Sequence, residues 1–306
     1  LTSANGTLYI VGLVRDAAKT LPKDVKRLRK FEAHFARVEW LFIESDSTDS
    51  TLDLLEAYKR EIPLFDYLTF GVLQDVLPSR IERIAHCRNA YVEVISKKIK
   101  SSSEKKSWVL VVDLDNLNRR LRPKDVVDAI SLNIGNAYFP NQAGPYYDLF
   151  ALRHAVWMPG DCFDSMRRGI ESGMTPELAG MISIGSRMVT IDPKTKPFRV
   201  DSAFGGAGIY LAKDFVEARY SPYDASGNVV CEHVSFNSQV AAKGNGLWLL
   251  PSFINAGLTN HSFSQSRNYR FVQPIFSTMR KSLSNILGPN RTDQLYKMLR
   301  SVFSRY

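Results

Sequence analysis

Short apolar runs alternate with amphipathic stretches through the first 120 residues. The apolar runs are 8–14, 38–43 and 108–112. Each has the length and composition of a strand that is buried on both faces. Helical spacing of apolar positions covers 23–36, 51–60 and 80–98. This alternation predicts right-handed βαβ units and therefore a parallel sheet, with Ser47 or Asp49 capping the second helix and a polar loop at 101–106.

Polar residues follow each of the three predicted strands. Arg15 and Asp16 follow the first, 44–49 follows the second, and Asp113 and Asp115 follow the third. Ligands of parallel sheets bind at the carboxyl ends of the strands. The sequence therefore predicts one site that combines these three segments.

The second half of the chain is less regular and is richer in glycine, proline and aromatic residues. A strand is predicted over 146–153. We interpret 119–266 as an acceptor half that folds onto the same sheet as 1–118, which makes one domain of 1–266. Beyond it, apolar and basic groups alternate over 267–306, which predicts a helical basic extension.

The composition is that of an ordinary globular protein. With 306 residues and 44% hydrophobic content, the chain can form one large domain or two small ones. No apolar run reaches the roughly 18 residues of a membrane span. An N-terminal anchor is not excluded, because the sequence begins at Leu1. The three widely spaced cysteines predict neither a zinc site nor a disulfide framework, and favour the cytoplasm or the cytosolic face of a membrane.

The net charge of +9 fits anionic partners of several classes. Nucleic acid is not expected, because no RNA- or DNA-binding motif accompanies the charge. Residues 267–306 hold eight Lys or Arg against one acid. This excess predicts a peripheral membrane contact through the basic C-terminus, and the alternative is a helical cap over the domain.

Asp113-Leu114-Asp115 is the strongest chemical signal. Two carboxylates at i and i+2, where a strand gives way to a turn, can face one cleft and hold a hard divalent cation. Mn²⁺ or Mg²⁺ held there would neutralise a departing diphosphate. The alternative is that each aspartate only ends a strand or caps a helix.

The order of motifs resembles that of family 2 glycosyltransferases and their GT-A relatives. The resemblance rests on the acidic turn Glu44-Ser45-Asp46-Ser47-Thr48-Asp49, the pair Arg88-Asn89 and the DxD at 113–115, and it covers about residues 7–118. It implies a GT-A type α/β fold, with a Rossmann-like, mostly parallel sheet flanked by helices. It also implies a metal-dependent transfer of a hexose from a UDP- or GDP-sugar donor to a glycan or lipid-linked acceptor.

The same resemblance implies roles for individual residues of the first half. Arg15, Glu44 and Asp46 are expected at the nucleotide sugar, with Arg88 on the nucleotide or its diphosphate. Arginine suits phosphate because it offers a bidentate donor fork. Ser45 replaces the second acid of the family motif, which leaves the identity of the nucleotide open.

Three motifs of the second half are similar to segments of GT-A enzymes. Gly205-Gly206-Ala207-Gly208 resembles the glycine segment that lies beside the donor in Fringe-like β-1,3-glycosyltransferases, so Gly205 and Gly206 are expected at the nucleotide sugar. Glu232 is the expected catalytic base of an inverting reaction. His261 is the expected third metal ligand, with His233 as its competitor.

Tyr147, Asp148 and Arg153 form a polar and aromatic group that is expected to bind the acceptor, because aromatic faces stack on sugar rings. The alternative is that the aromatic side chain fills the core.

Other functions stay open beside an inverting transferase. The chain also resembles the retaining capsule-associated mannosyltransferases of fungi, and in such an enzyme Glu232 would not be a base. A sugar nucleotidyltransferase is disfavoured, because 14–18 lacks glycine. A non-catalytic glycan-binding module on the same fold is the third possibility.

Overall fold

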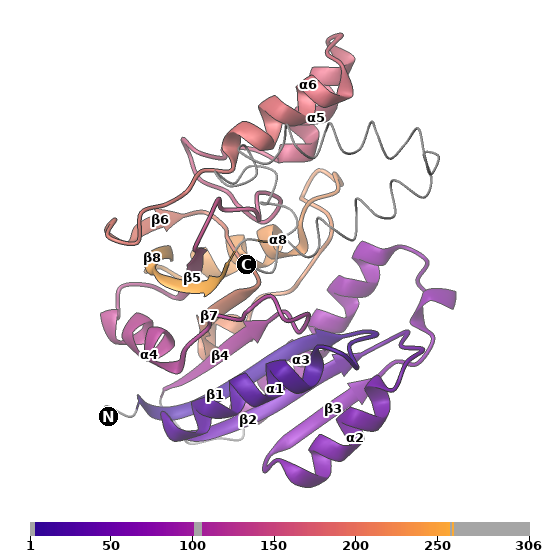
Figure 1. Cartoon of the computed structure of the whole chain (residues 1–306), viewed down its shortest axis with the longest axis vertical. Helices are drawn as coiled ribbons and strands as arrows, with labels where there is room; N and C mark the ends of the chain where they lie inside the picture. Colours follow the sequence, from indigo (N-terminus) through magenta and orange to yellow (C-terminus); the bar gives the residue numbers. More distant parts are fainter. Residues whose placement is uncertain (1–3, 101–105, 258, 260–306) are drawn as a thin grey trace, which may run out of the picture.

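The computed structural model of this chain describes residues 4–100, 106–257 and 259, and it shows a single eight-stranded sheet between helices (Figure 1). The strand order is β3-β2-β1-β4-β7-β5-β8-β6. The first four strands are β1 (Ala4–Val14), β2 (Phe35–Glu44), β3 (Phe65–Thr69) and β4 (Ser107–Val112). They pair in parallel, with β1 between β2 and β4.

The helices of the first half are α1 (Leu21–Leu28), α2 (Thr51–Glu61) and α3 (Arg80–Lys100), with short 3₁₀ segments η1 (Arg29–Ala33) and η2 (Leu73–Asp75). The helix predicted over 23–36 is shorter than expected, because it tightens into η1 and Phe35 already belongs to β2. The predicted cap of α2 is also corrected. Ser50 is the N-cap residue, while the Asp49 carboxylate accepts from the backbone N–H of Thr51.

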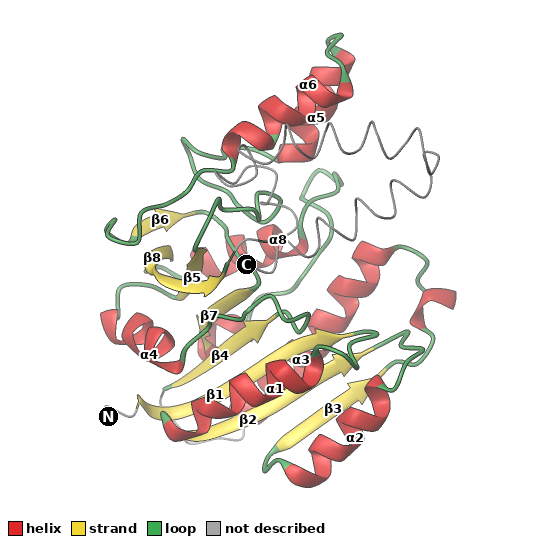
Figure 2. Cartoon of the chain, viewed as in Figure 1, coloured by secondary structure: helices red, strands yellow, loops and turns green. Residues whose placement is uncertain are grey.

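The second half extends the same sheet. Its strands are β5 (Ala137–Gln142), β6 (Phe198–Val200), β7 (Ala207–Leu211) and β8 (Leu247–Ala256). Strand β7 runs antiparallel to both β4 and β5, β8 is parallel to β5, and β6 is antiparallel to β8. The helices are α4 (Pro123–Leu132), α5 (Cys162–Glu171), α6 (Pro176–Ser183), α7 (Ala212–Phe215) and α8 (Glu232–Ala241), with η3 at Gly185–Arg187. Helices α5 and α6 form a hairpin that projects away from the sheet (Figure 2).

Each face of the sheet has its own apolar core. Successive strand residues point to opposite faces. Val11 of β1 accordingly packs with α3, α7 and α8, while its neighbour Ile10 packs with α1, α2 and α4. Burial on both faces explains why the strands read as unbroken apolar runs.

The strand predicted over 146–153 is wrong. This segment forms turns, held by isolated bridges from Pro145 to Thr190 and from Arg153 to Ser202. The Asp148 carboxylate accepts from the backbone N–H of Ala151, and a side-chain acceptor of this kind competes with strand pairing.

Several predictions concern residues outside the described ranges. They are His261, the helical extension at 267–306 and most of the loop at 101–106. Among the helices that the structure does describe, none is long and apolar enough to cross a bilayer.

Candidate active site

A cavity of about 450 Å³, which we call the central cavity, opens at the carboxyl ends of β1, β2 and β4. From β1 the chain proceeds to β2 on one side and later to β4 on the other, so the strand order reverses at β1. Ligands of open α/β sheets bind at this kind of topological switch point. Arg15, Asp46, Asp113 and Asp115, which follow the three strands, all line the central cavity, so the structure brings together the three predicted segments.

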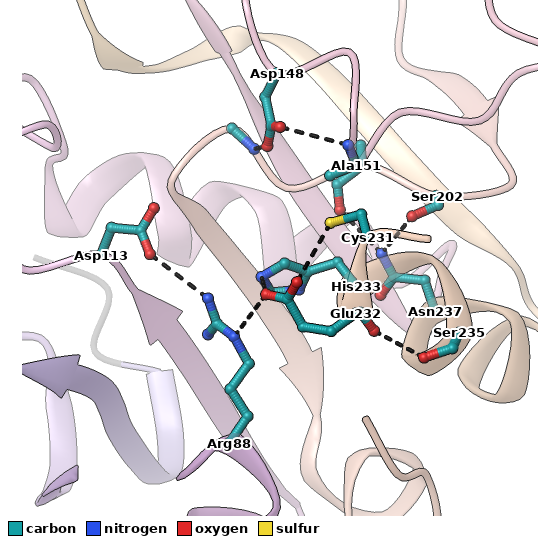
Figure 3. Close-up of polar contacts among 12 residues, drawn as sticks. Arg88, Asp113, Asp148, Ala151, Ser202, Cys231, Glu232, His233, Ser235 and Asn237 are labelled. Atoms are coloured by element: carbon teal, nitrogen blue, oxygen red, sulfur yellow. Dashed lines mark hydrogen bonds and ion pairs between the residues drawn. The ribbon is translucent and has the colours of Figure 1, made fainter. Parts of the chain in front are cut away.

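Arg88 lines the central cavity and lies between Asp113 and Glu232 (Figure 3). It projects from α3, and its side chain is only 7% exposed. Its Nε donates to Glu232 Oε1 at 3.0 Å, its Nη1 donates to the Tyr91 hydroxyl at 3.1 Å, and its Nη2 lies 3.7 Å from Asp113 Oδ1. The guanidinium also faces the rings of Phe204 and Tyr220 at 5.3 and 5.6 Å. One buried cation therefore contacts carboxylates from both halves of the chain.

Glu232 and His233 begin α8 and line the opposite side of the central cavity from Asp113. The second oxygen of Glu232 accepts from the Cys231 thiol at 3.7 Å. His233 stacks on Phe204 with ring centroids 3.7 Å apart, and neither ring nitrogen has a hydrogen-bond partner among the described residues. Burial, with the nearby Arg88 charge, holds the pKa of His233 well below its usual value, so the imidazole is neutral.

Asp113 and Asp115 follow β4 directly and face the central cavity. The Asp113 side chain is 36% exposed. Burial raises the pKa of its carboxyl to about 7 against the opposing effect of Arg88, and the charges of Asp115, Asp148 and Glu232 raise it further. A bound cation would oppose both the burial and the like charges, because it favours the ionised form of a carboxyl.

The turn at Gly205 and Gly206 holds Asp113 and Asp148 rather than lining the central cavity. Gly205 N–H donates to Asp148 Oδ2 at 2.7 Å, and Asp113 N–H donates to the carbonyl of Gly206 at 2.9 Å. Both glycines have positive φ, +67° and +90°. A Cβ on Gly206 would lie 2.3 Å from Leu117 Cδ2. Positive φ therefore favours glycine at both positions, and a Cβ on Gly206 would in addition force the Leu117 side chain to move.

Two buried amides clamp the same turn. Asn118 Nδ2 donates to the carbonyls of Asp113 and Gly206 at 3.0 and 2.8 Å. Asn255 Nδ2, from β8, donates to Asn118 Oδ1 at 2.7 Å and to the carbonyl of Gly205 at 2.8 Å. Neither Asn118 nor Asn255 belongs to a motif that the sequence makes recognisable. For Asn118, the only signal in the sequence is its position five residues after Asp113, and Asn255 has no such signal.

Asp46 and Glu44 build the acidic turn after β2 in different ways. Asp46 has a φ of +61° and lines the central cavity, where its Oδ2 lies 3.4 Å from Arg83 Nε. Arg83 is a further cation of the site that the motifs did not indicate. Glu44 does not line the central cavity. It is buried and accepts from Ser47 N–H and from the Thr69 hydroxyl, so it supports the turn.

The expected acceptor group divides in two. Tyr147 and Asp148 line the central cavity. Arg153 does not, because its guanidinium is bound to Asp161 at 2.6 Å and to the carbonyls of Phe150 and Leu152. Its observed role is to brace the turns between 150 and 161.

The donor set for a metal consists of Asp113 and Asp115, since His261 lies outside the described residues. Within the described ranges no cluster of three or more His, Cys, Asp or Glu side chains has metal-binding geometry. Two carboxylates nevertheless suit Mg²⁺ or Mn²⁺, which often bind through one or two protein carboxylates and complete their shell with water and substrate phosphates. The raised pKa of Asp113 is consistent with a place for a cation.

No protein-family model and no curated protein matches this chain. Solved structures similar to it include residues 1–349 of S. aureus TarS in complex with UDP-GlcNAc, at 12% identity over 95% of this chain and 70% of that chain, with a TM-score of 0.45. A longer S. aureus TarS structure matches at 14% identity over 94% of this chain and 42% of that chain, with a TM-score of 0.48. The mannosyltransferase PcManGT from Pyrobaculum calidifontis, in complex with GDP-Man and Mn²⁺, matches at 10% identity over 82% and 56%, with a TM-score of 0.41.

Proposed function

We propose that this chain is a GT-A type, metal-dependent glycosyltransferase that moves a hexose from a UDP- or GDP-sugar to a glycan or glycolipid hydroxyl. The observation that carries the proposal is the position of Asp113 and Asp115 at the switch point of the sheet, with Asp113 facing the buried guanidinium of Arg88. The motif order Glu44–Asp49, Arg88-Asn89 and 113–115 supports the same function. The domain would span 1–266, with the donor half at 1–118 and the acceptor half at 119–266.

The donor would bind across the carboxyl ends of β1, β2 and β4. Arg15 and Arg83 offer cationic side chains to the diphosphate and Asp46 offers a carboxylate to the nucleoside, since all three line the central cavity. Arginine forks match phosphate oxygens in charge and geometry. The turns that carry these side chains would be held in place by Glu44, Gly205 and Gly206, whose role would be indirect.

Asp113 and Asp115 would hold the Mn²⁺ or Mg²⁺, together with His261 if the chain beyond 259 brings it there. A bound divalent cation neutralises the charge that develops on a departing diphosphate. The carboxylates would have to be ionised to bind it, so the proton that Asp113 holds near neutral pH must leave first.

In the inverting reaction that we favour, an acceptor hydroxyl attacks the anomeric carbon while the bond from that carbon to the diphosphate oxygen breaks. Glu232 would take the hydroxyl proton, and the diphosphate would leave with the electron pair. Glu232 supports this assignment because it lines the central cavity opposite Asp113. Tyr147 and Asp148 would position the acceptor, since both line the same cavity as Glu232.

One observation favours a retaining mannosyltransferase as the alternative. Glu232 Oε1 is bound to the Arg88 guanidinium at 3.0 Å, so this oxygen already has a partner in the position where an acceptor hydroxyl would have to approach it. NMR of the product anomer separates the two mechanisms. An inverted linkage supports Glu232 as base, whereas a retained linkage removes that role.

Thermal shift with UDP-, GDP-, CMP- and dTDP-sugars, with and without Mn²⁺, tests the donor site. A ligand that binds only the folded state raises the melting temperature. We expect a metal-dependent shift with a UDP- or GDP-sugar that Asp115→Asn abolishes. Asp128→Asn, at an exposed carboxylate on α4 that pairs with Lys124, should retain it. If no donor produces a shift, the non-catalytic glycan-binding module becomes the better interpretation.

We also propose that the basic extension at 267–306 brings the enzyme to the cytosolic face of a membrane. The support is its excess of eight basic residues over one acid. Flotation with anionic liposomes, with and without residues 268–306, tests this proposal. Equal flotation of both proteins would contradict it.

A further inference from the structure

A second cavity, of about 630 Å³, carries a strong excess of positive charge, and we call it the basic pocket. One wall is α1 with the turn that follows it, and the other is the loop before α4, with Leu121 and Ile254 as the apolar lining. The remaining lining residues are Lys23, Lys26, Arg27, Lys30, Arg119, Arg120 and Arg122. Seven basic side chains therefore line this cavity, and no acidic side chain lines it among the described residues.

Most of these cations have no acidic partner among the residues that the structure describes. Arg27 pairs with Asp24 at 2.6 Å and Arg122 pairs with Asp125 at 2.7 Å. The other five make no ion pair within the described part of the chain. Lys23 and Lys26 are three residues apart on α1, and Lys30 follows on η1, so like charges lie along one wall of the pocket. Such an arrangement disfavours the helix unless an anion compensates it.

The lining indicates the chemistry of that anion. Arginine forks and lysine ammonium groups together are the usual protein ligands of phosphate. The pocket is concave, which suits a compact group. The described lining contains no aromatic side chain on which a base could stack, so single-stranded nucleic acid fits poorly.

The basic pocket borders the loop that carries the two aspartates. Asn116, the residue after Asp115, accepts from Arg27 Nη2 at 3.2 Å and donates its N–H to Asp24 Oδ2 at 2.9 Å. The central cavity and the basic pocket thus use opposite ends of the segment 113–122. An anion in the basic pocket would lie beside the proposed donor without sharing its ligands.

We propose that the basic pocket binds a phosphate, diphosphate or phosphodiester group of the acceptor substrate. The inference rests on the proposed function, in which the donor diphosphate belongs to the central cavity and the acceptor is the substrate left to carry a second anion. The enzyme would accordingly act on a phosphate-bearing acceptor in preference to a neutral glycan.

Titration calorimetry of the whole chain with inorganic pyrophosphate in EDTA tests the pocket without occupying a metal-dependent donor site. We expect saturable binding that becomes at least tenfold weaker in Arg119→Ser/Arg120→Ser and in Lys23→Ser/Lys26→Ser, which alter different walls. Lys194→Ser/Lys196→Ser removes two exposed cations elsewhere and should bind as the unmodified protein does. Arg15→Ser should also retain binding, because Arg15 lines only the other cavity.

Equal affinity in all variants would overturn the proposal, as would an equal loss in the Lys194 and Lys196 control. Loss in Arg15→Ser alone would place the anion in the central cavity and would also overturn it. Melting curves of each variant show that the fold is retained. Donor binding with Mn²⁺ is read separately, so its failure would contradict the proposed function and leave the pocket result standing.

Vesicles of phosphatidylglycerol or phosphatidylcholine distinguish the sources of the phosphate. Co-sedimentation with phosphatidylglycerol alone that is weaker in both pocket variants than in the unmodified chain would assign the group to a lipid headgroup. Pyrophosphate binding, with co-sedimentation equal in the pocket variants and the unmodified chain, would assign it to a soluble acceptor, because residues 267–306 are themselves proposed to bind anionic lipid. Either result supports a phosphate site in the basic pocket.

Discussion

Arg88 connects the carboxylates and the aromatic rings of the central cavity. It neutralises Glu232 directly, faces Asp113 and covers two aromatic rings, although its side chain is 7% exposed. Burying a charge is costly unless it is paired and hydrogen-bonded, and Arg88 is both. Glu232 depends on it in turn, since the two form a buried ion pair across 144 residues of sequence.

Arg88→Met should therefore destabilise the fold strongly, because it leaves Glu232 buried without a counter-charge. Breaking a buried pair in this way costs about 3–5 kcal/mol of unfolding free energy. The double variant Arg88→Met/Glu232→Gln should recover part of that loss. Urea unfolding of the two single variants and the double variant gives the coupling energy. Additive losses would show that the pair contributes nothing to stability.

Metal affinity should depend on pH through Asp113. Because the pKa of its carboxyl is raised to about 7, protons compete with the metal below neutrality, and affinity should rise as the pH rises through 7. Below that value the loss approaches tenfold per pH unit for one proton displaced. Calorimetric titration of Mn²⁺ at pH 5.5, 6.5 and 8 measures this dependence. His261→Ala serves as the control for histidine protonation, and equal affinities at pH 5.5 and 8 would contradict the prediction.

At the scale of elements, the glycine turn between β6 and β7 is what joins the halves of the site. Gly205 N–H donates to the Asp148 carboxylate, and the Gly206 carbonyl accepts from Asp113 N–H. The side-chain amides of Asn118 and Asn255 donate to the carbonyls of Gly206 and Gly205, respectively. The turn thus places a carboxylate of each half at the same cavity.

Gly206→Ala should disrupt this turn by steric conflict with Leu117. Gly227 provides a matched control, because its φ of +82° is close to the +90° of Gly206, yet an added Cβ there meets nothing within 4 Å. Backbone strain alone should cost Gly227→Ala about 1 kcal/mol. Gly206→Ala should cost more and should weaken Mn²⁺ binding. Unfolding and metal titration measure both effects, and equal costs for the two variants would refute the clash.

Most elements of the first half could be predicted because their signals are local, although β3 (Phe65–Thr69) had no predicted counterpart. The apolar runs at 8–14, 38–43 and 108–112 and the helical period at 80–98 correspond closely to β1, β2, β4 and α3. The mixed direction of the second half could not be predicted in this way. Insertion of β7 between β4 and β5 depends on pairing partners far apart in the chain, and local patterns do not encode such pairing.

The same division applies to the site. Strand ends indicated that Arg15, Asp46 and Asp113 would meet, because parallel strands share one carboxyl edge. The Arg88–Glu232 pair and the stacking of His233 on Phe204 had no comparable signal, since only the tertiary fold brings those segments together. The strand predicted over 146–153 failed because a single side-chain acceptor, Asp148, closes a turn there.

At the scale of the whole molecule, one sheet runs through both halves. Strand β4 pairs with β1 on one edge and with β7 on the other, so no edge of the sheet separates 1–118 from 119–266. The two apolar cores also draw on residues of both halves. A continuous sheet with shared cores predicts one cooperative unit of folding.

A fragment of residues 1–118 should accordingly fail to fold on its own. It would expose the apolar edge strand β4 and lose α4, α7 and α8 from the two cores, and exposed edges of this kind promote aggregation. Circular dichroism and size-exclusion chromatography of the fragment test this expectation. A cooperative thermal transition of a monomeric fragment would contradict it.

The bond from Asp113 N–H to the Gly206 carbonyl has a consequence for protein synthesis. A ribosome adds about 5–20 residues per second, so the segment with the aspartates emerges several seconds before the turn that anchors it. Until β7 inserts beside β4, a nascent chain has the carboxylates of 113–115 without their final orientation. Early binding of the proposed divalent cation or nucleotide by the incomplete chain is thereby disfavoured. The proposed donor site would be complete only after most of the polypeptide has been made.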